Sequence, residues 1–88
     1  MTAASKLVWK TQSKHRTYAT VGRWALIVDK RPEGYTWELH ASMPRDLGEA
    51  RLQWVAGSIR WIATRREARS EAVRALRALG VAVRESRS

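Results

Sequence analysis

Apolar and polar residues alternate with a period of two along two neighbouring stretches of the chain, residues 23–30 and 35–40. The apolar positions of the two stretches are Trp24, Leu26, Val28, Tyr35, Trp37 and Leu39. Alternation of this kind is typical of strands that bury one face and leave the other open to water. The segment between them, Arg31-Pro32-Glu33-Gly34, predicts a turn, because proline presets φ and glycine tolerates the reversed φ that closes the turn. Residues 16–21 are rich in β-branched and aromatic side chains and precede Gly22, which predicts a further strand.

The strands over residues 16–21, 23–30 and 35–40 predict two successive hairpins. The segment that follows the second hairpin has two possible interpretations. Residues 41–46 form a polar loop with Pro44, and residues 51–56 then alternate as a strand does. Asp46 followed by Glu49 is also a capping-box pattern, so residues 47–56 can instead be a short helix, which would place two helices around Gly57-Ser58 as in a helix-turn-helix module. The strand is the favoured interpretation. Residues 59–63 then either continue this strand beyond a bulge or return as another strand.

The last element is a helix that begins at residue 65 and ends at about residue 79. Thr64-Arg65-Arg66-Glu67 is a capping box, in which the threonine hydroxyl accepts from the amide of Glu67. Gly80 is placed to cap the C-terminal end. Apolar residues recur at helical spacing and define the buried stripe: Ala68, Ala72, Ala75, Leu76 and Leu79. Val81-Ala82-Val83 can add a short strand, but residues 81–88 are predicted to be a C-terminal tail.

These elements predict an α+β fold, an antiparallel meander of three or four strands with one C-terminal helix packed on one face. A chain of 88 residues suffices for one core. We therefore expect a single domain over residues 16–80, a partly ordered basic segment over residues 1–15 and the tail over residues 81–88.

The charge of the chain narrows its function. Seventeen basic residues oppose eight acidic ones, a net charge of +9. Residues 1–31 carry a net +6, residues 32–64 a net −1 and residues 65–88 a net +4. Basic ends of this kind favour a polyanionic partner, usually nucleic acid, through counterion release and long-range steering.

Catalytic and metal chemistry are poorly represented. There is no cysteine, and the two histidines, His15 and His40, lie in separate segments without ligand spacing. The five glycines are scattered singly, so no phosphate-binding glycine-rich loop is present. We expect neither a cofactor nor enzymatic activity. No apolar run approaches the roughly 20 residues that span a bilayer, so a soluble, cytoplasmic protein without a membrane partner is expected.

Two sets of residues are candidates for binding. The helix presents Arg66, Arg69, Arg74 and Arg77 along one flank, with Glu67 and Glu71 on the other. Because Glu38 on the open sheet face would oppose phosphates, contacts are assigned to the helix and the N-terminal segment: Lys10, Lys14, Arg16, Arg66, Arg69 and Arg77. Five Trp and two Tyr exceed the number of large rings that so small a core can hold. At least one Trp should be exposed, with Trp9 and Trp61 as possible aromatic contacts that stack on bases or anchor a protein interface.

The order of aromatic residues and glycines carries a resemblance. The residues concerned are Trp9, Tyr18-Ala19, Gly22, Trp24-x-Leu26-x-Val28, Gly34-Tyr35-x-Trp37-x-Leu39, Gly57 and Thr64-x-x-Glu67-Ala68-Arg69. This layout, over residues 9–69, resembles small uncharacterised proteins of actinobacteriophages. The resemblance implies a phage-encoded protein that works in the host cytoplasm, and no site residues carry over from it. The predicted sheet and helix are also similar to DNA-binding modules of phage integrases and plant ethylene-response factors, a likeness of fold alone.

Two functional hypotheses follow from the sequence. The first is a small basic protein that binds nucleic acid, DNA or RNA, mainly through phosphate contacts and without sequence specificity. The second is an interaction protein that binds and modulates a host protein, or forms a homodimer, through an exposed Trp or an unpaired strand edge.

Overall fold

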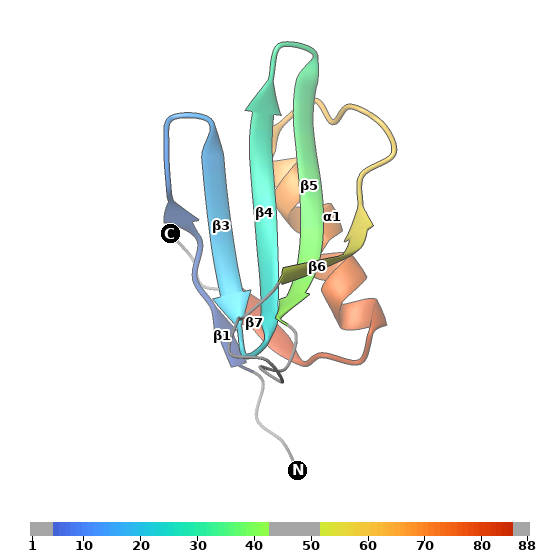
Figure 1. Ribbon diagram of the computed structural model, residues 1–88. Helices are drawn as coiled ribbons and strands as arrows, with labels where there is room; N and C mark the ends of the chain where they lie inside the picture. Colours follow the sequence, from blue (N-terminus) through green and yellow to red (C-terminus); the bar gives the residue numbers. More distant parts are fainter. Residues whose placement is uncertain (1–4, 43–51, 86–88) are drawn as a thin grey trace.

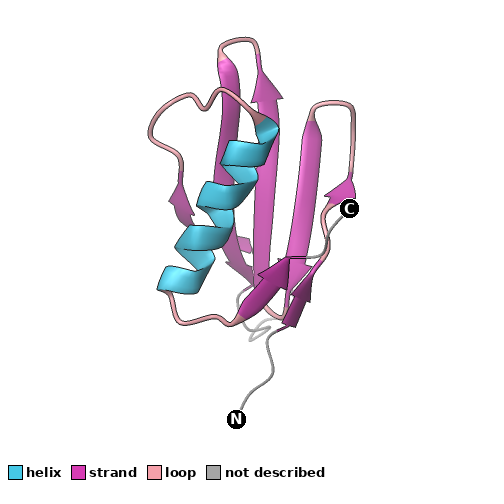
Figure 2. Cartoon of the chain, turned by 180° about the vertical axis from the view of Figure 1, so that it is seen from behind, coloured by secondary structure: helices cyan, strands magenta, loops and turns pink. Residues whose placement is uncertain are grey.

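The computed structural model describes residues 5–42 and 52–85, which form a five-stranded antiparallel sheet with one helix across one of its faces (Figures 1 and 2). The sheet order is β2-β3-β4-β5-β6. Its strands are β2 (Lys10–Thr11), β3 (Arg16–Val21), β4 (Trp24–Arg31), β5 (Gly34–Ser42) and β6 (Leu52–Gly57). The helix is α1 (Arg65–Ala78), and β1 (Ser5–Leu7) pairs in parallel with β7 (Val83–Glu85) in a separate small sheet. The predicted α+β class is confirmed, with five strands in the main sheet.

The two predicted hairpins determine which side chains face the helix. In the register of the sheet, Leu26 lies opposite Ala19 on β3 and Leu39 on β5. All three side chains are buried, and the strands alternate as predicted because successive side chains point to opposite faces. Gly22 has a φ of 57° in the turn between β3 and β4, a conformation that glycine adopts without steric cost.

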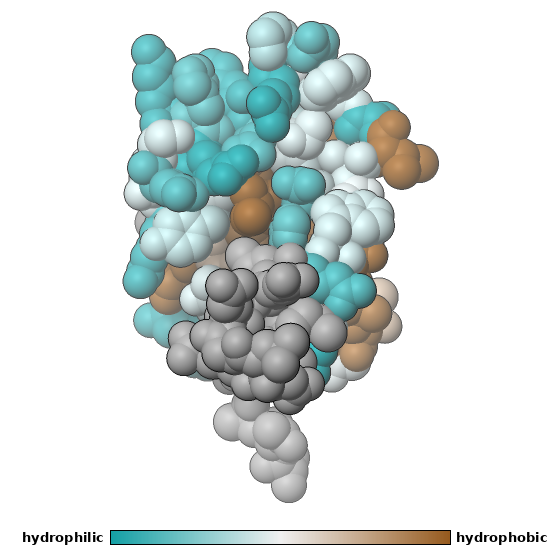
Figure 3. Space-filling view, in the orientation of Figure 1, coloured by the Kyte–Doolittle hydropathy of each residue, from teal (hydrophilic) through white to brown (hydrophobic). Residues whose placement is uncertain are grey.

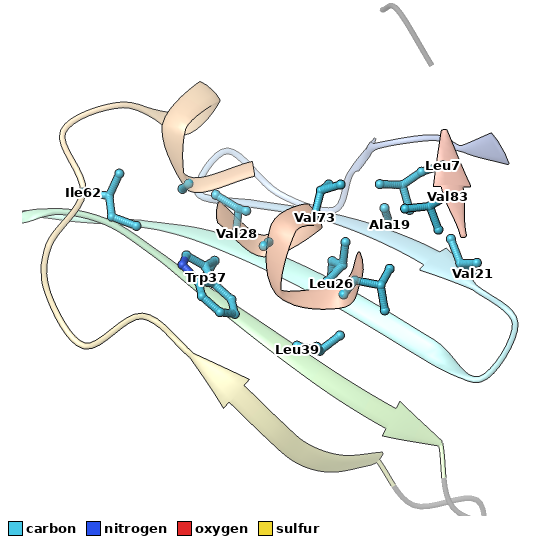
Figure 4. Packing of buried hydrophobic residues seen from close by; sticks show 13 residues of the cluster. Leu7, Ala19, Val21, Leu26, Val28, Trp37, Leu39, Ile62, Val73 and Val83 are labelled. Carbon is cyan, nitrogen blue, oxygen red and sulfur yellow. The ribbon is translucent and has the colours of Figure 1, made fainter. Parts of the chain in front are cut away.

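The core lies between α1 and the sheet and extends to the small sheet (Figure 4). Val28, Trp37 and Leu39 are buried beneath the helix, and Leu7 and Val83 extend the cluster toward Ala19. The apolar stripe of α1 is narrow because it consists mainly of alanine, and small side chains allow the helix to lie close to the strands. The helix covers β4 and β5 on this face and β1 packs against β3, and the opposite face of the sheet is here called the open face.

Of the two interpretations of the segment after β5, the strand is confirmed for the residues that the structure describes. Residues 52–57 form β6, which pairs with β5 and shifts register between Leu39 and His40. The capping-box pattern at Asp46 and Glu49 lies outside the described residues. Residues 59–63 are not a strand; only an isolated bridge joins Tyr35 and Ile62, with backbone N···O distances of 2.8 and 2.9 Å. This stretch crosses the end of the sheet to reach the helix, which is why it cannot pair along its length.

The helix begins as predicted, and its buried face differs slightly from the prediction. Thr64 is the N-cap, and its hydroxyl oxygen accepts from the amide of Glu67 at 3.1 Å. Gly80 has a φ of 85° beyond the last turn, where its amide donates to the carbonyl of Arg77. Val73 is buried, whereas Leu79 is about half exposed because the helix has ended there.

The C-terminal residues correct the prediction of a tail. Val83–Glu85 form β7, paired with β1 in parallel register, and the Val83 side chain belongs to the core. A guanidinium nitrogen of Arg77 donates to the carbonyl of Val83 at 3.1 Å. The pairing joins the two ends of the chain, so no local sequence pattern reveals it.

Thr64→Ala should lower the free energy of unfolding by about 1 kcal/mol, because it removes the acceptor of an otherwise unsatisfied helix amide. The measurement is urea unfolding followed by circular dichroism. Ser70→Ala on the exposed middle of the helix is the matched control and should change stability by no more than about 0.5 kcal/mol. Equal losses in the two variants would contradict the capping role.

Candidate functional site

The six basic residues predicted to contact nucleic acid fall on two different faces of the molecule. Lys10 pairs with Tyr18 on the open face, Lys14 is exposed in the turn between β2 and β3, and Arg16 begins β3. The remaining three, Arg66, Arg69 and Arg77, belong to the helix, which lies across the opposite face of the sheet and is in front in Figure 2. The six predicted residues therefore do not form one continuous binding surface.

On the open face, Arg16 is held by a buried carboxylate. Its Nε and one terminal nitrogen donate to the two oxygens of Asp29 at 2.7 and 3.1 Å. Asp29 is only 6% exposed, and a terminal nitrogen of Arg31 lies 3.7 Å from its Oδ2. The hydrogen bond that Arg16 donates to Asp29 is the main cause that raises the pKa of Arg16, and burial opposes it. Arg16 is thus fixed in place as a positioning group, while the more exposed Arg31 keeps donors toward water.

These residues surround a hollow of about 410 Å³ at the end of β3 and β4, here called the basic hollow. Its lining is Gln12, Ser13, His15, Arg16, Asp29, Lys30 and Arg31. Two guanidinium groups, those of Arg16 and Arg31, face the carboxylate of Asp29 there, and the exposed Lys14 lies in the turn between the lining residues Ser13 and His15. Across residues 5–42 and 52–85, no carboxylate forms an ion pair with Lys14 or Lys30. Figure 3 shows hydrophilic residues gathered over this part of the open face.

The outer surface of the helix is electrostatically balanced by comparison. A hollow of about 480 Å³ there is lined by Thr64, Arg66, Glu67, Ser70, Glu71 and Arg74, so two guanidinium groups face two carboxylates. Arg69 is half-buried, with its guanidinium carbon 5.1 Å from the centre of the Trp9 ring. Arg77 is bound to the Val83 carbonyl. The helix arginines therefore do not form one open basic row.

A second hollow on the open face, of about 460 Å³, contains two exposed tryptophans and is here called the aromatic hollow. Its lining is Arg31, Thr36, Trp37, Glu38, Trp54, Gly57, Ser58 and Trp61. Trp54 is 56% exposed and Trp61 is 50% exposed. Arg31 lines both hollows, so the basic and aromatic surfaces meet at this side chain.

The other three tryptophans are less available. Trp37 is buried, and its indole nitrogen donates to Glu71 at 3.4 Å. Trp24 is half-buried with the guanidinium carbon of Arg23 at 5.4 Å from its ring centre. Trp9, predicted as an aromatic contact, packs half-buried against the core. Of the two predicted aromatic contacts, only Trp61 is an exposed ring.

Sequence reasoning did not select Trp54 or Arg31 as site residues. Trp54 belongs to the alternating pattern of residues 51–56. That pattern assigns its side chain to one side of a strand, but it does not tell whether that side is exposed to solvent. In the sequence, Arg31 stands at the end of a predicted strand and the start of a turn. It joins the site because β3 pairs with β4, which sets Arg16 opposite Asp29 and places Arg31 beside that carboxylate.

Comparison of the chain with protein-family models, with curated proteins and with solved structures finds no match. The site is therefore defined by its geometry. Within residues 5–42 and 52–85, no three His, Asp or Glu side chains gather in a way that would hold a metal ion. The helix in the described part of the chain lacks the length and apolar character needed to cross a membrane.

Proposed function

We propose that this protein binds nucleic acid through phosphate contacts made by the open face of its sheet. The contacting groups are Lys10, Lys14 and Arg31, and Arg16 positions the surface through Asp29. The observation that carries the proposal is the basic hollow, where cations outnumber carboxylates on the face of the sheet that α1 does not cover. Phosphate oxygens are the acceptors that such a group of ammonium and guanidinium donors binds most strongly.

The open face supports this function better than the helix does. Glu67 and Glu71 share the outer helix surface with Arg66 and Arg74. Glu71 is paired with Arg60 at 3.4 Å, and a phosphate there would still meet repulsion from Glu67. In the basic hollow the single carboxylate, Asp29, is already paired with Arg16 and Arg31. The charge left over at that end of the sheet is positive, which is what attracts a polyanion at long range.

The test is fluorescence anisotropy of labelled duplex and single-stranded DNA at two salt concentrations. We expect micromolar or tighter binding at low salt that weakens steeply as salt rises, because each neutralised phosphate releases counterions. Binding that ignored salt, or no binding at low salt, would contradict phosphate recognition.

A second candidate function is a protein contact or homodimer through the same open face. The observation that favours it is that β6 lies at the edge of the sheet and carries the exposed Trp54. An unpaired edge strand offers backbone donors and acceptors to another chain. Light scattering distinguishes this function, because a dimer that persisted in high salt and dissociated on Trp54→Ala would favour it over nucleic-acid binding.

A further inference from the structure

We propose that the ligand of the open face is a single-stranded nucleic acid, whose phosphates lie on the basic hollow and whose unpaired bases stack on Trp54 and Trp61. This inference rests on the proposed nucleic-acid binding and specifies its substrate. Figure 3 shows paler residues of intermediate hydropathy on the β6 side of the open face, next to the hydrophilic region. Phosphate-binding cations beside stacking rings are the combination that single strands require.

Trp54 is supported from beneath by backbone. A Cβ atom at Gly57 would lie 3.2 Å from both Cζ2 and Nε1 of Trp54, so the ring rests against a position that has no side chain. The pairing of Trp54 with His40 places the ring on the open face. With more than half of its surface exposed, the ring has a supported side and a side open to a ligand. A ring held in this way loses little conformational entropy when a base stacks on it.

Trp61 is held by the end of the sheet. Its neighbour Ile62 exchanges two backbone hydrogen bonds with Tyr35, and a Cβ atom at Gly34 would lie 3.3 Å from the Cβ of Trp61. This close approach fixes the backbone of Trp61 against the turn between β4 and β5. The ring itself stays half exposed and lines the aromatic hollow. Both tryptophans therefore stand on rigid backbone.

The charges divide the open face into a phosphate region and a base region. In the aromatic hollow, Arg31 and Glu38 offset one another, so the surface near the rings is close to neutral. Phosphates gain little there, whereas uncharged bases can stack, and the carboxylate of Glu38 can accept from their amino groups. Arg31 lines both hollows, so one strand can cross from the basic region to the rings. A duplex keeps its bases paired and stacked inside, so their flat faces cannot reach these rings.

The experiment compares oligothymidylate of about 12 nucleotides, oligouridylate of the same length and a duplex of that length. Binding is followed by anisotropy of the labelled strand and by quenching of tryptophan fluorescence. We expect both single strands to bind at least about 10-fold more tightly than the duplex, with quenching, because only they stack on the rings. A difference between the DNA and RNA strands would identify which source of single strand the surface prefers.

Substitution separates stacking from simple contact. Trp54→Ala and Trp61→Ala should each weaken single-strand binding about 5- to 150-fold and leave the dependence on salt unchanged, because the phosphate contacts remain. Trp54→Phe should keep most of the affinity, whereas Trp54→Leu, which is apolar but has no ring, should not. Ile59→Ala is the matched control, since Ile59 is a fully exposed apolar side chain that lines neither hollow. Circular dichroism confirms that each variant is folded.

The outcomes distinguish the inference from the function on which it rests. Equal, salt-dependent binding of duplex and single strand, unaffected by the Trp substitutions, would overturn single-strand recognition and leave the proposed phosphate binding standing. No binding of any strand at low salt would overturn both. Trp variants that changed only the oligomeric state would assign the aromatic hollow to a protein contact and overturn the inference.

Discussion

A protein that carries Lys14→Glu together with Arg31→Glu should bind nucleic acid about 100-fold more weakly at low salt than the unmodified chain. Each reversal replaces a phosphate-binding cation with a repelling carboxylate, and a tenfold loss per position corresponds to about 1.4 kcal/mol. The slope of the logarithm of affinity against the logarithm of salt should also fall by about 1.4 for a single strand, since two phosphate contacts are lost. Anisotropy titrations across a salt series measure both quantities.

The matched control is Arg66→Glu together with Arg74→Glu on the outer surface of the helix. Each reversal removes two units of charge, so both double variants lower the formal net charge of +9 by the same four units. Any general effect of net charge is then equal, and only the local contacts differ. We expect the helix variant to lose no more than about 5-fold, through weaker steering alone. A larger loss in the helix variant than in the sheet variant would place the binding surface on the helix.

Gly34→Ala should lower the free energy of unfolding by about 2–4 kcal/mol. Gly34 has a φ of 147°, which residues with a side chain rarely adopt, and an added Cβ would lie 2.8 Å from the carbonyl oxygen of Ile62. That oxygen belongs to the backbone and accepts from the amide of Tyr35, so it cannot move without breaking the bridge that fixes Trp61. Urea unfolding followed by circular dichroism measures the loss.

Gly22→Ala is the control for Gly34→Ala. Gly22 also has a positive φ, of 57°, but an added Cβ there would meet no atom within 4 Å. Its cost is therefore that of the left-handed conformation alone, about 1 kcal/mol. Equal losses in the two variants would show that the close approach to Ile62 contributes nothing to stability.

Because Gly34 contacts Trp61, the Gly34→Ala substitution should change the affinity for nucleic acid as well as the stability. If the folded fraction of Gly34→Ala is isolated under stabilising conditions, its affinity for a single strand should fall more than its affinity for a duplex. The reason is that the three atoms nearest to the added Cβ belong to Trp61 and Ile62, which do not line the basic hollow, although Arg31 of that hollow pairs with Gly34. The two titrations need the same protein preparation, and unchanged affinities would separate the bridge from the binding surface.

Local patterns in the sequence were sufficient to predict most of the elements. The alternation from Trp24 to Leu39 depends only on the period of a strand, and it correctly placed the side chains of β4 and β5 that face the helix. The capping box at Thr64 depends on neighbours three residues apart, and it correctly marked the first residue of α1. In both cases the interacting groups are close along the chain, so their spacing carries the information.

Contacts between distant segments were decided only by the tertiary structure. The pairing of β1 with β7 joins Ser5 to Val83, and each strand by itself is too short to be distinguished from a tail. The basic hollow exists because β3 and β4 pair in one particular register, which sets Arg16 opposite Asp29 and draws Arg31 alongside. Likewise the exposure of Trp54 depends on which face of β6 the helix covers.

The amino-acid sequence by itself thus determined the fold class, the helix with its cap, the buried faces of the central strands and the excess of positive charge. It did not determine where that charge acts. Seven arginines and lysines of residues 1–31 and seven arginines of residues 65–88 look equivalent along the chain. Packing the helix against one face of the sheet places the two sets on opposite sides of the molecule. The helix arginines share their surface with Glu67 and Glu71, whereas the one carboxylate in the basic hollow, Asp29, is buried and paired with Arg16 and Arg31.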